Sequence, residues 1–501
     1  MPWPQSSIQA TGKCSGHRHC KCLRVHRTRL NQHIWPRSPA DGPRKNAIES
    51  LQKQIEFHVG EAHRLRYVQN SHAVVSRLPE ELLAEVFPYI VESGIQNDDS
   101  RFAKGTFNFL RVFKHWNEVA VSLPRLWRWW VPGAVKAWPL FHSRSKDTPI
   151  FLKWRPRVPF SALADISPGV PKRIHHLDFN GTSEQLVELW SAFGSNSSNI
   201  SSLRLEISVY GSREPRKDLV RFFTSSFPKL SHLAFVDFLP DSSSPIFTTS
   251  NLTSFKLSFP HRREQNYTLS QFSQLLQRHP NLQELVLSSG ALPLLERSSS
   301  PLVPLILPRL AILRLYGSEA AILGLVDLIN MSSPLHNVVI GFKQSPKPTV
   351  ADLAGAVQKI LVAYYECQGL KFPREIHHFT ILYDPEVECL VFRARSRPGL
   401  TPDLSSSLKL QFQDTDELVG DAVVKETFPL FPLNSVRKFT VEGPDIYGNR
   451  YRGMLQKMKD LSYLQLNKQD ISLVLQALHP GDQNSSRVII KVMPIHPCVR
   501  R

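Results

Sequence analysis

The side chains best suited to hold a metal gather near the N-terminus, at Cys14, His17, His19, Cys20 and Cys22. Thiolate and imidazole are the ligands that zinc prefers. Their spacing, C-x5-C-x-C, matches no usual zinc finger, and no second ligand pair follows at a suitable distance. We therefore interpret the group as a chance cluster in a basic tail and predict no metal site.

The sequence offers no set of residues for catalysis. It has no phosphate-binding glycine loop, no HExxH, no GxSxG and no pair of CxxC motifs. The histidine pairs His175-His176 and His377-His378 lie in expected strands, where consecutive side chains point to opposite faces, so one buried and one exposed histidine is expected in each pair. Cys367 and Cys389 have no identifiable base and are interpreted as core residues. We predict a non-catalytic protein without a cofactor.

The formal net charge of +18 suggests an acidic partner. The region of residues 1–45 carries many Lys and Arg residues and a single acidic one, Asp41. Elsewhere the positive charges are scattered along the chain, with no stripe interleaved with aromatic residues. This pattern argues against sequence-directed nucleic-acid binding. A basic nuclear protein that binds nucleic acid through the N-terminal arm stays open as an alternative.

Composition favours a globular protein of two or three domains, since 42% of the 501 residues are hydrophobic and 21% are charged. No apolar run approaches the length that a bilayer requires, and the first residues lack the apolar core of a secretory signal. Six cysteines do not make a disulfide framework in a chain of this length. A cytoplasmic or nuclear location, away from membranes, is the simplest expectation.

The N-terminal region divides into two parts. Residues 1–45 are rich in Pro, Ser, Arg and His and are expected to be disordered. Residues 46–70 form an expected amphipathic helix, whose apolar residues approximate a heptad at Ile48, Leu51, Ile55, Ala62 and Leu65. A short coiled coil over residues 47–68 would pair two copies weakly, and the alternative is a single helix packed beside the module that follows.

Residues 76–131 form the next module, an expected group of three short helices. Pro79, Glu80 and Glu81 suit the first turn of a helix. A first apolar face follows, a second amphipathic segment surrounds Trp116, and Pro124 separates a short aromatic piece. Helices this small cannot bury all of their Leu, Phe and Trp surface, so part of it is expected to contact a partner.

The stretch LPEELLAEVF…LRVFKHWNEVAVSLPRLW within this module resembles an F-box, the helical module with which substrate receptors bind the Skp adaptor of cullin-based ubiquitin ligases. Phe113 stands where the family usually has Cys, Pro88 is expected to kink or end the first helix, and the segment 91–108 is longer than in the shortest members. A helix ahead of the module is similar to an arrangement in many fungal F-box proteins. The resemblance implies that the adaptor is bound by Leu78, Pro79, Leu82, Leu83, Val86, Phe87, Leu110, Val112, Trp116, Val119, Leu126 and Trp127.

The C-terminal part repeats the phrase L-x-x-L-x-L. It is read from residues 174, 200, 230, 252, 282, 310 and 335, and again from 436 and 461. Helical segments lie between several phrases, as in YTLSQFSQLLQRHPN and EAAILGLVDLINMSSP. After a Pro-rich transition at 132–172, with a strand expected at 150–154, residues 173–496 therefore resemble degenerate leucine-rich repeats. Residues 341–430 break the period and suggest an insertion or an antiparallel patch, and 488–501 would supply a last strand.

The predicted fold class is α/β, with a three-helix F-box followed by an irregular solenoid that resembles leucine-rich repeats. Two ordinary α/β domains are the alternative architecture. The resemblance implies a substrate-recognition subunit of a Skp–cullin–F-box ubiquitin ligase, whose repeat domain binds an unknown substrate protein. A scaffold that uses its F-box outside the ligase is the rival function.

Overall fold

The computed structural model describes residues 41–73, 78–97, 107–111, 114–155, 169–193, 198–207, 227–248, 251–259, 267–288, 290–294, 304–330, 335–343, 350–366, 376–384, 389–396, 407–413, 425–431, 433–442, 455, 457–467 and 489–493. The chain divides into two compact units, Met1–Pro79 and Glu80–Arg501. The Cys and His residues at 14–22 and the basic arm up to residue 40 lie outside the described residues.

The first unit contains helix α2 (Asp41–Ser71), which includes the helix predicted at 46–70. The helix begins earlier than expected, so residues 41–45 belong to it and the prediction of disorder is wrong there. Pro43 falls in the first turn, where a helix tolerates proline. The heptad residues Ile48, Leu51 and Ile55 are all exposed, which is the placement that a pairing stripe requires.

The second unit begins with short helices that pack against one another. They are α3 (Glu80–Asn97), the 3-10 turn η2 (Asn108–Arg111), α5 (Lys114–Ser122) and the 3-10 turn η3 (Pro124–Arg128), followed by η4 (Pro132–Ala137) and α6 (Trp138–Ser145). Helix α3 contacts both α5 and η3, and η3 contacts α6.

Prolines lie inside or in the first turn of several helices in this region. Helix α3 runs through Pro88 to Asn97, so Pro88 does not end it. Val91, beyond the proline, is fully buried, and burial of one Val side chain contributes about 1.5–3 kcal/mol, similar to the proline penalty of about 3 kcal/mol. The transition at 132–172 also forms regular elements, η4 and α6, because Pro132 and Pro139 occupy first-turn positions.

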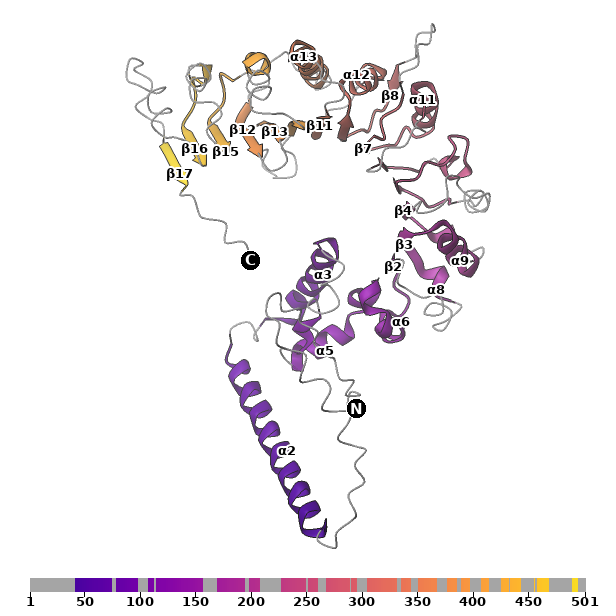
Figure 1. Cartoon of the computed structure of the whole chain (residues 1–501), viewed down its shortest axis with the longest axis vertical. Helices are drawn as coiled ribbons and strands as arrows, with labels where there is room; N and C mark the ends of the chain where they lie inside the picture. Colours follow the sequence, from indigo (N-terminus) through magenta and orange to yellow (C-terminus); the bar gives the residue numbers. More distant parts are fainter. Residues whose placement is uncertain are drawn as a thin grey trace. The chain divides into compact units, whose positions relative to one another are not determined.

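The rest of the second unit is built on one large, mostly parallel sheet (Figure 1). Its first strands are β1 (Trp129–Trp130), β2 (Ile150–Trp154), β3 (Ile174–Gly181), β4 (Ser202–Ile207), β5 (His232–Val236), β6 (Ser254–Ser258), β7 (Glu284–Ser288), β9 (Ile312–Gly317) and β11 (Asn337–Lys343). The later ones are β12 (Ile376–Asp384), β13 (Cys389–Ser396), β14 (Ser407–Gln413), β15 (Lys438–Glu442), β16 (Tyr463–Asn467) and β17 (Ile489–Met493). Every predicted L-x-x-L-x-L phrase forms a strand, and the expected strands at 150–154 and near the C-terminus are present as β2 and β17.

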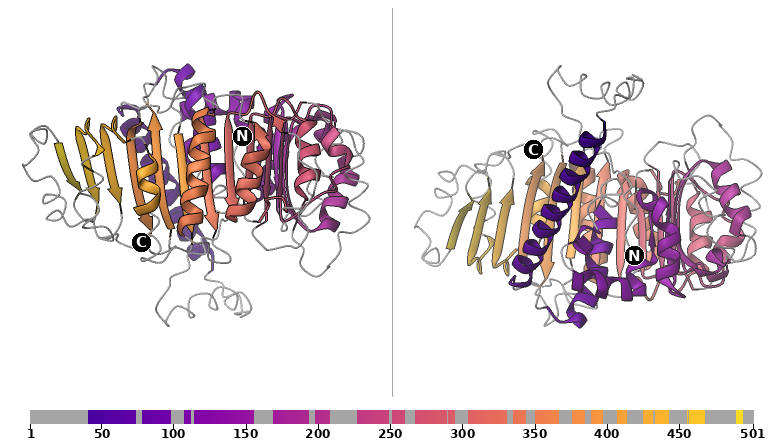
Figure 2. Two further views of the ribbon diagram at one scale, coloured as in Figure 1. Left: turned by 90° about the horizontal axis from the view of Figure 1, so that it is seen from above. Right: turned by 90° about the horizontal axis from the view of Figure 1, so that it is seen from below.

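Helices lie on one face of this sheet (Figures 1 and 2). They include α8 (Val170–Arg173), α9 (Ser183–Phe193), η6 (Pro245–Thr248), α11 (Leu269–Gln277), α12 (Glu319–Leu328) and α13 (Val350–Glu366), with a further turn at η8 (Phe428–Leu430) and a two-stranded sheet of β8 (Leu305–Ile306) and β10 (Ile329–Asn330). The helices predicted at 267–281 and 319–334 are confirmed as α11 and α12. Alternate strand residues such as Leu203 and Leu205 are buried, and the residues between them face the other side.

A ladder of hydrogen bonds joins successive strands just before each begins. Ser231 donates its backbone N–H and its hydroxyl to the carbonyl of Ser201, and Thr253 does the same to Ser231. Ser462 makes the equivalent pair of bonds to Arg437. Hydroxyl side chains at these positions therefore add a second bond to each backbone bond between neighbouring strands.

The break in the period at 341–430 is explained by strand order. The sheet runs β11-β14-β13-β12-β15, with β13 antiparallel to both of its neighbours. The expected antiparallel patch is therefore present, and it is inserted within an otherwise parallel sheet. Strand β14 pairs in parallel with β11, and β12 pairs in parallel with β15.

Aromatic side chains connect the N-terminal helices of this unit to the sheet. Trp130 of β1 stacks on Trp138 of α6 with ring centroids 5.6 Å apart, and Trp138 lies 6.3 Å from Trp154 of β2. All three indoles are fully buried, so α6 covers the first edge of the sheet core. Burial on this scale fixes the short helices to the sheet.

Candidate functional site

Helix α3 carries two sets of apolar residues, one buried and one exposed to solvent. Leu83, Phe87 and Val91 are at most 1% exposed and face the neighbouring helices. Leu82, Val86, Tyr89 and Ile90 are 53%, 42%, 73% and 37% exposed and form what we call the outer face of α3. Within each set the residues recur at the helical interval of three or four positions, so each set forms its own stripe along the helix.

The buried face rests on aromatic packing. The Phe87 ring meets the edge of Trp116 at 5.6 Å between centroids. Trp127 stacks on Phe107 at 5.7 Å and donates its indole N–H to the carbonyl of Ala120 at 2.9 Å. Because the Trp127 ring is buried with its one donor satisfied, it ties η3 to α5 and holds α3 in place.

The twelve residues predicted to bind the adaptor fall into different environments. Leu83, Phe87, Val119, Leu126 and Trp127 are buried, Leu110 and Trp116 are half-buried, and Leu82 and Val86 are exposed. Within the first unit, Leu78 is half-buried and Pro79 exposed. Val112 lies outside the described residues. The buried residues hold the helices together, and only the exposed ones are available for contact with a partner.

The set predicted to bind the adaptor lacks two residues of the outer face, Tyr89 and Ile90. Tyr89 is the most exposed of its four members, yet the prediction placed only aliphatic neighbours on this helix surface. The signal was present, because Tyr89 follows Leu82 by seven residues, two helical turns.

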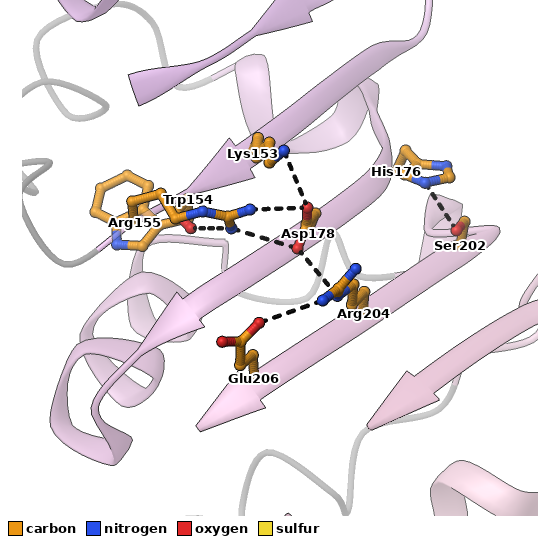
Figure 3. A network of polar contacts seen from close by, with 8 residues as sticks. All are labelled: Lys153, Trp154, Arg155, His176, Asp178, Ser202, Arg204 and Glu206. Atoms are coloured by element: carbon orange, nitrogen blue, oxygen red, sulfur yellow. Dashed lines mark hydrogen bonds and ion pairs between the residues drawn. The ribbon is translucent and has the colours of Figure 1, made fainter. Parts of the chain in front are cut away.

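A network of charged side chains lies on the sheet face opposite the helices (Figure 3). Asp178 of β3 lies within 3.2 Å of the Arg155 guanidinium, 3.7 Å of Arg204 and 3.9 Å of Lys153, and Arg204 also reaches Glu206 at 3.3 Å. One carboxylate is therefore shared by three cations from neighbouring strands. The cluster keeps a positive excess.

His176 lies beside this cluster and is held neutral. Its Nε2 lies 3.0 Å from the Ser202 hydroxyl, and Phe151 stacks on its ring at 4.9 Å between centroids. Burial lowers the pKa of His176 from 6.5 to about 4; Asp178 opposes the shift, and the charges of His232 and Arg128 add to it. A neutral imidazole here is part of the packed surface.

The expectation of one buried and one exposed histidine in each pair is wrong at His175 and His176, which are both half-buried. The sheet register shifts between Ile150 and Phe151 opposite this pair, so strict alternation is broken where the two histidines lie. The side chains of the second histidine pair, and those of Cys367 and Cys389, lie outside the described residues. Within the described ranges, no three His, Cys, Asp or Glu side chains are grouped to hold a metal ion.

In the part of the chain that the structure describes, no helix has the length and apolar character needed to cross a bilayer. The chain matches no protein-family model, and a search of curated proteins finds no significant relative.

Proposed function

We propose that the chain is a substrate-recognition subunit of a Skp–cullin–F-box ubiquitin ligase. The short helices of residues 80–130 would bind the Skp adaptor, and the sheet that follows would hold a substrate protein. The observation that carries this proposal is the outer face of α3, an exposed apolar surface beside the buried residues Leu83, Phe87 and Val91 of the same helix.

The outer face has the properties of a helix-packing interface. Its members Leu82, Val86, Tyr89 and Ile90 form one stripe, and Phe87 and Trp116 beneath them fix the helix. Covering a half-exposed Leu or Val side chain contributes about 1 kcal/mol, and an aromatic anchor contributes more. A few such anchors give a specific contact because the helix is already ordered.

The regular strand pairing supports a solenoid that resembles leucine-rich repeats. Each L-x-x-L-x-L phrase supplies one strand, and the bonds from Ser231, Thr253 and Ser462 join each repeat to the one before it. The antiparallel strand β13 is the departure from this scheme. In this proposal the chain makes and breaks no bond itself and acts by holding a substrate lysine near the conjugating enzyme.

A pull-down with purified Skp adaptor tests the proposal. The full-length wild type should retain the adaptor, and Leu82→Ser/Tyr89→Ser should reduce retention at least about tenfold, because two anchors of the outer face are lost. The matched control Leu294→Ser/Ile306→Ser removes two exposed apolar side chains elsewhere in the same unit. It should bind like the wild type.

Circular dichroism confirms that each variant is folded. If the wild type does not retain the adaptor, or the outer-face variant retains it fully, the F-box assignment is wrong. A scaffold role outside the ligase predicts adaptor binding without recruitment of cullin.

A further inference from the structure

The sheet aligns basic residues that are far apart in the sequence. On the face opposite the helices, strand pairing places Lys153, Asp178, Arg204, Ala234, Lys256, Val286, Arg314, Val339 and Lys409 side by side at one level of the sheet. We call Lys153, Arg204, Lys256, Arg314 and Lys409 the basic row. Positive charges that are scattered in the sequence therefore lie along one line of the fold.

The basic row has a regular period. Its members occupy every second strand of the sheet order β2-β3-β4-β5-β6-β7-β9-β11-β14. Neighbouring strands are about 4.8 Å apart, so successive cations repeat at about 10 Å over roughly 40 Å. The strands between them contribute the small or apolar residues Ala234, Val286 and Val339, and Asp178 in one place.

The row is only partly neutralised by its neighbours. Lys256 pairs with Glu284 at 2.8 Å, and Arg204 shares Asp178 and Glu206, yet the Arg204 and Lys256 side chains stay 49% and 44% exposed. No described residue bonds to the buried Nε of Arg314. From β2 to β14 on this face, the described cations include the basic row, Arg155, and Arg128, whose guanidinium lies 4.5 Å from the centre of the Phe151 ring. The carboxylates beside the row are those of Asp178, Glu206 and Glu284.

We propose that this face binds an acidic, Asp/Glu-rich segment of a partner protein, laid in extended form across the strands. An extended chain advances about 3.3 Å per residue, so acidic side chains at every third residue repeat at about 10 Å and meet the basic row one by one. The proposal deepens the proposed function, because it names the chemistry that the substrate-binding domain would recognise.

The row fits such a segment better than a nucleic acid. Grooves for single strands combine cations with aromatic platforms on which bases stack. Here the intervening positions of the row are Asp178, Ala234, Val286 and Val339. The Phe151 and Tyr316 rings on the same face pack on His176 and Gly341 of neighbouring strands. The carboxylates of Asp178 and Glu284 would repel a uniformly charged phosphate backbone. A peptide with neutral residues between its acids avoids those carboxylates.

The test measures fluorescence anisotropy of labelled probes with the full-length chain and no adaptor present. One peptide of roughly forty ångströms in extended length carries glutamate at every third position, separated by Ser and Gly; a second has the same composition with its glutamates clustered. Oligo-dT is the third probe. The variant Arg204→Gln/Lys256→Gln removes two exposed cations of the row, and Arg125→Gln/Lys136→Gln removes two exposed cations outside it.

The spaced peptide should bind at low salt, several-fold more tightly than the clustered one. The row variant should weaken it about tenfold and the control variant less than about twofold, and added salt should weaken binding to the wild type. Absence of binding, equal losses in the two variants, or tighter binding of oligo-dT would overturn the proposal. Because the adaptor is absent, none of these results depends on whether the F-box assignment holds.

Discussion

Two adjacent leucines of α3 lie in different environments. Leu83 is fully buried and Leu82 is 53% exposed. Leu83→Ala should therefore cost about 2–5 kcal/mol in the free energy of unfolding, because it leaves a cavity between helices. Leu82→Ala should change that free energy by less than about 0.5 kcal/mol. Denaturant unfolding of both variants checks this; equal losses would show that the two faces are assigned wrongly.

Part of the pH dependence of the free energy of unfolding should come from His176. The folded state holds its pKa at about 4, below the usual 6.5, so acid protonates the unfolded chain first. The stability that this group contributes is present above pH 6.5 and is lost as the pH falls towards 4. From about pH 7 to pH 5, the wild type should lose roughly 2 kcal/mol more than His176→Gln, which has no titrating group at this position.

Chemical denaturation at the two pH values measures that difference. The Gln amide can still form a hydrogen bond with the Ser202 hydroxyl, so the variant should fold. His58→Gln on α2 removes an exposed histidine and is the control. Identical pH dependence in the wild type and His176→Gln would contradict the buried, neutral imidazole.

At the scale of single residues, the sequence predicts which side chains are apolar but not which of them a neighbour covers. The prediction placed Leu82 and Leu83 in one binding set, and the structure divides them because α5 and η3 pack against one side of α3 only. His176 shows the same limit, since its environment depends on Phe151 and Ser202 of two other strands.

At the scale of elements, the close approach of neighbouring strands constrains Gly341 of β11. It pairs with Tyr316 of β9, and an added Cβ would lie 2.3 Å from Cδ1 of that ring. Gly341→Ala should destabilise the fold by about 1–3 kcal/mol, and Tyr316→Leu should recover part of the loss by removing the ring.

The matched control is Gly355→Ala in α13, where an added Cβ meets nothing within 4 Å. It should stabilise the helix by about 0.5–1 kcal/mol. Thermal unfolding of the three single variants and the Gly341→Ala/Tyr316→Leu double variant measures both effects. A Gly341→Ala protein as stable as the wild type would show that Tyr316 does not lie over this glycine.

The strands were predictable because each phrase carries its own alternation of buried Leu or Phe and polar residues, as in Leu203 and Leu205 around Arg204. Elements that depend on contacts with distant parts of the chain were not predicted. Helix α6 forms in a Pro-rich stretch because Trp138 is buried between Trp130 and Trp154, and these partners are supplied by β1 and β2.

At the scale of the whole molecule, sheet order creates features that no local pattern contains. The basic row takes one residue from every second strand of the sheet, so its members lie tens of residues apart in the chain. The antiparallel insertion of β13 was predictable as a break in the period, but the order β11-β14-β13-β12 was not. The basic row and the strand order around β13 both depend on which strands pair with one another.

The proposed function requires the full-length chain to join adaptor and cullin in one complex, and the mass of that complex tests it most directly. Light scattering after size-exclusion chromatography of the chain, purified Skp adaptor and cullin should show one species that contains all three, and the Leu82→Ser/Tyr89→Ser variant should elute apart from the other two. Elution of the wild-type chain apart from both proteins would contradict the account. A species of chain and adaptor without cullin would replace the ligase subunit with a scaffold.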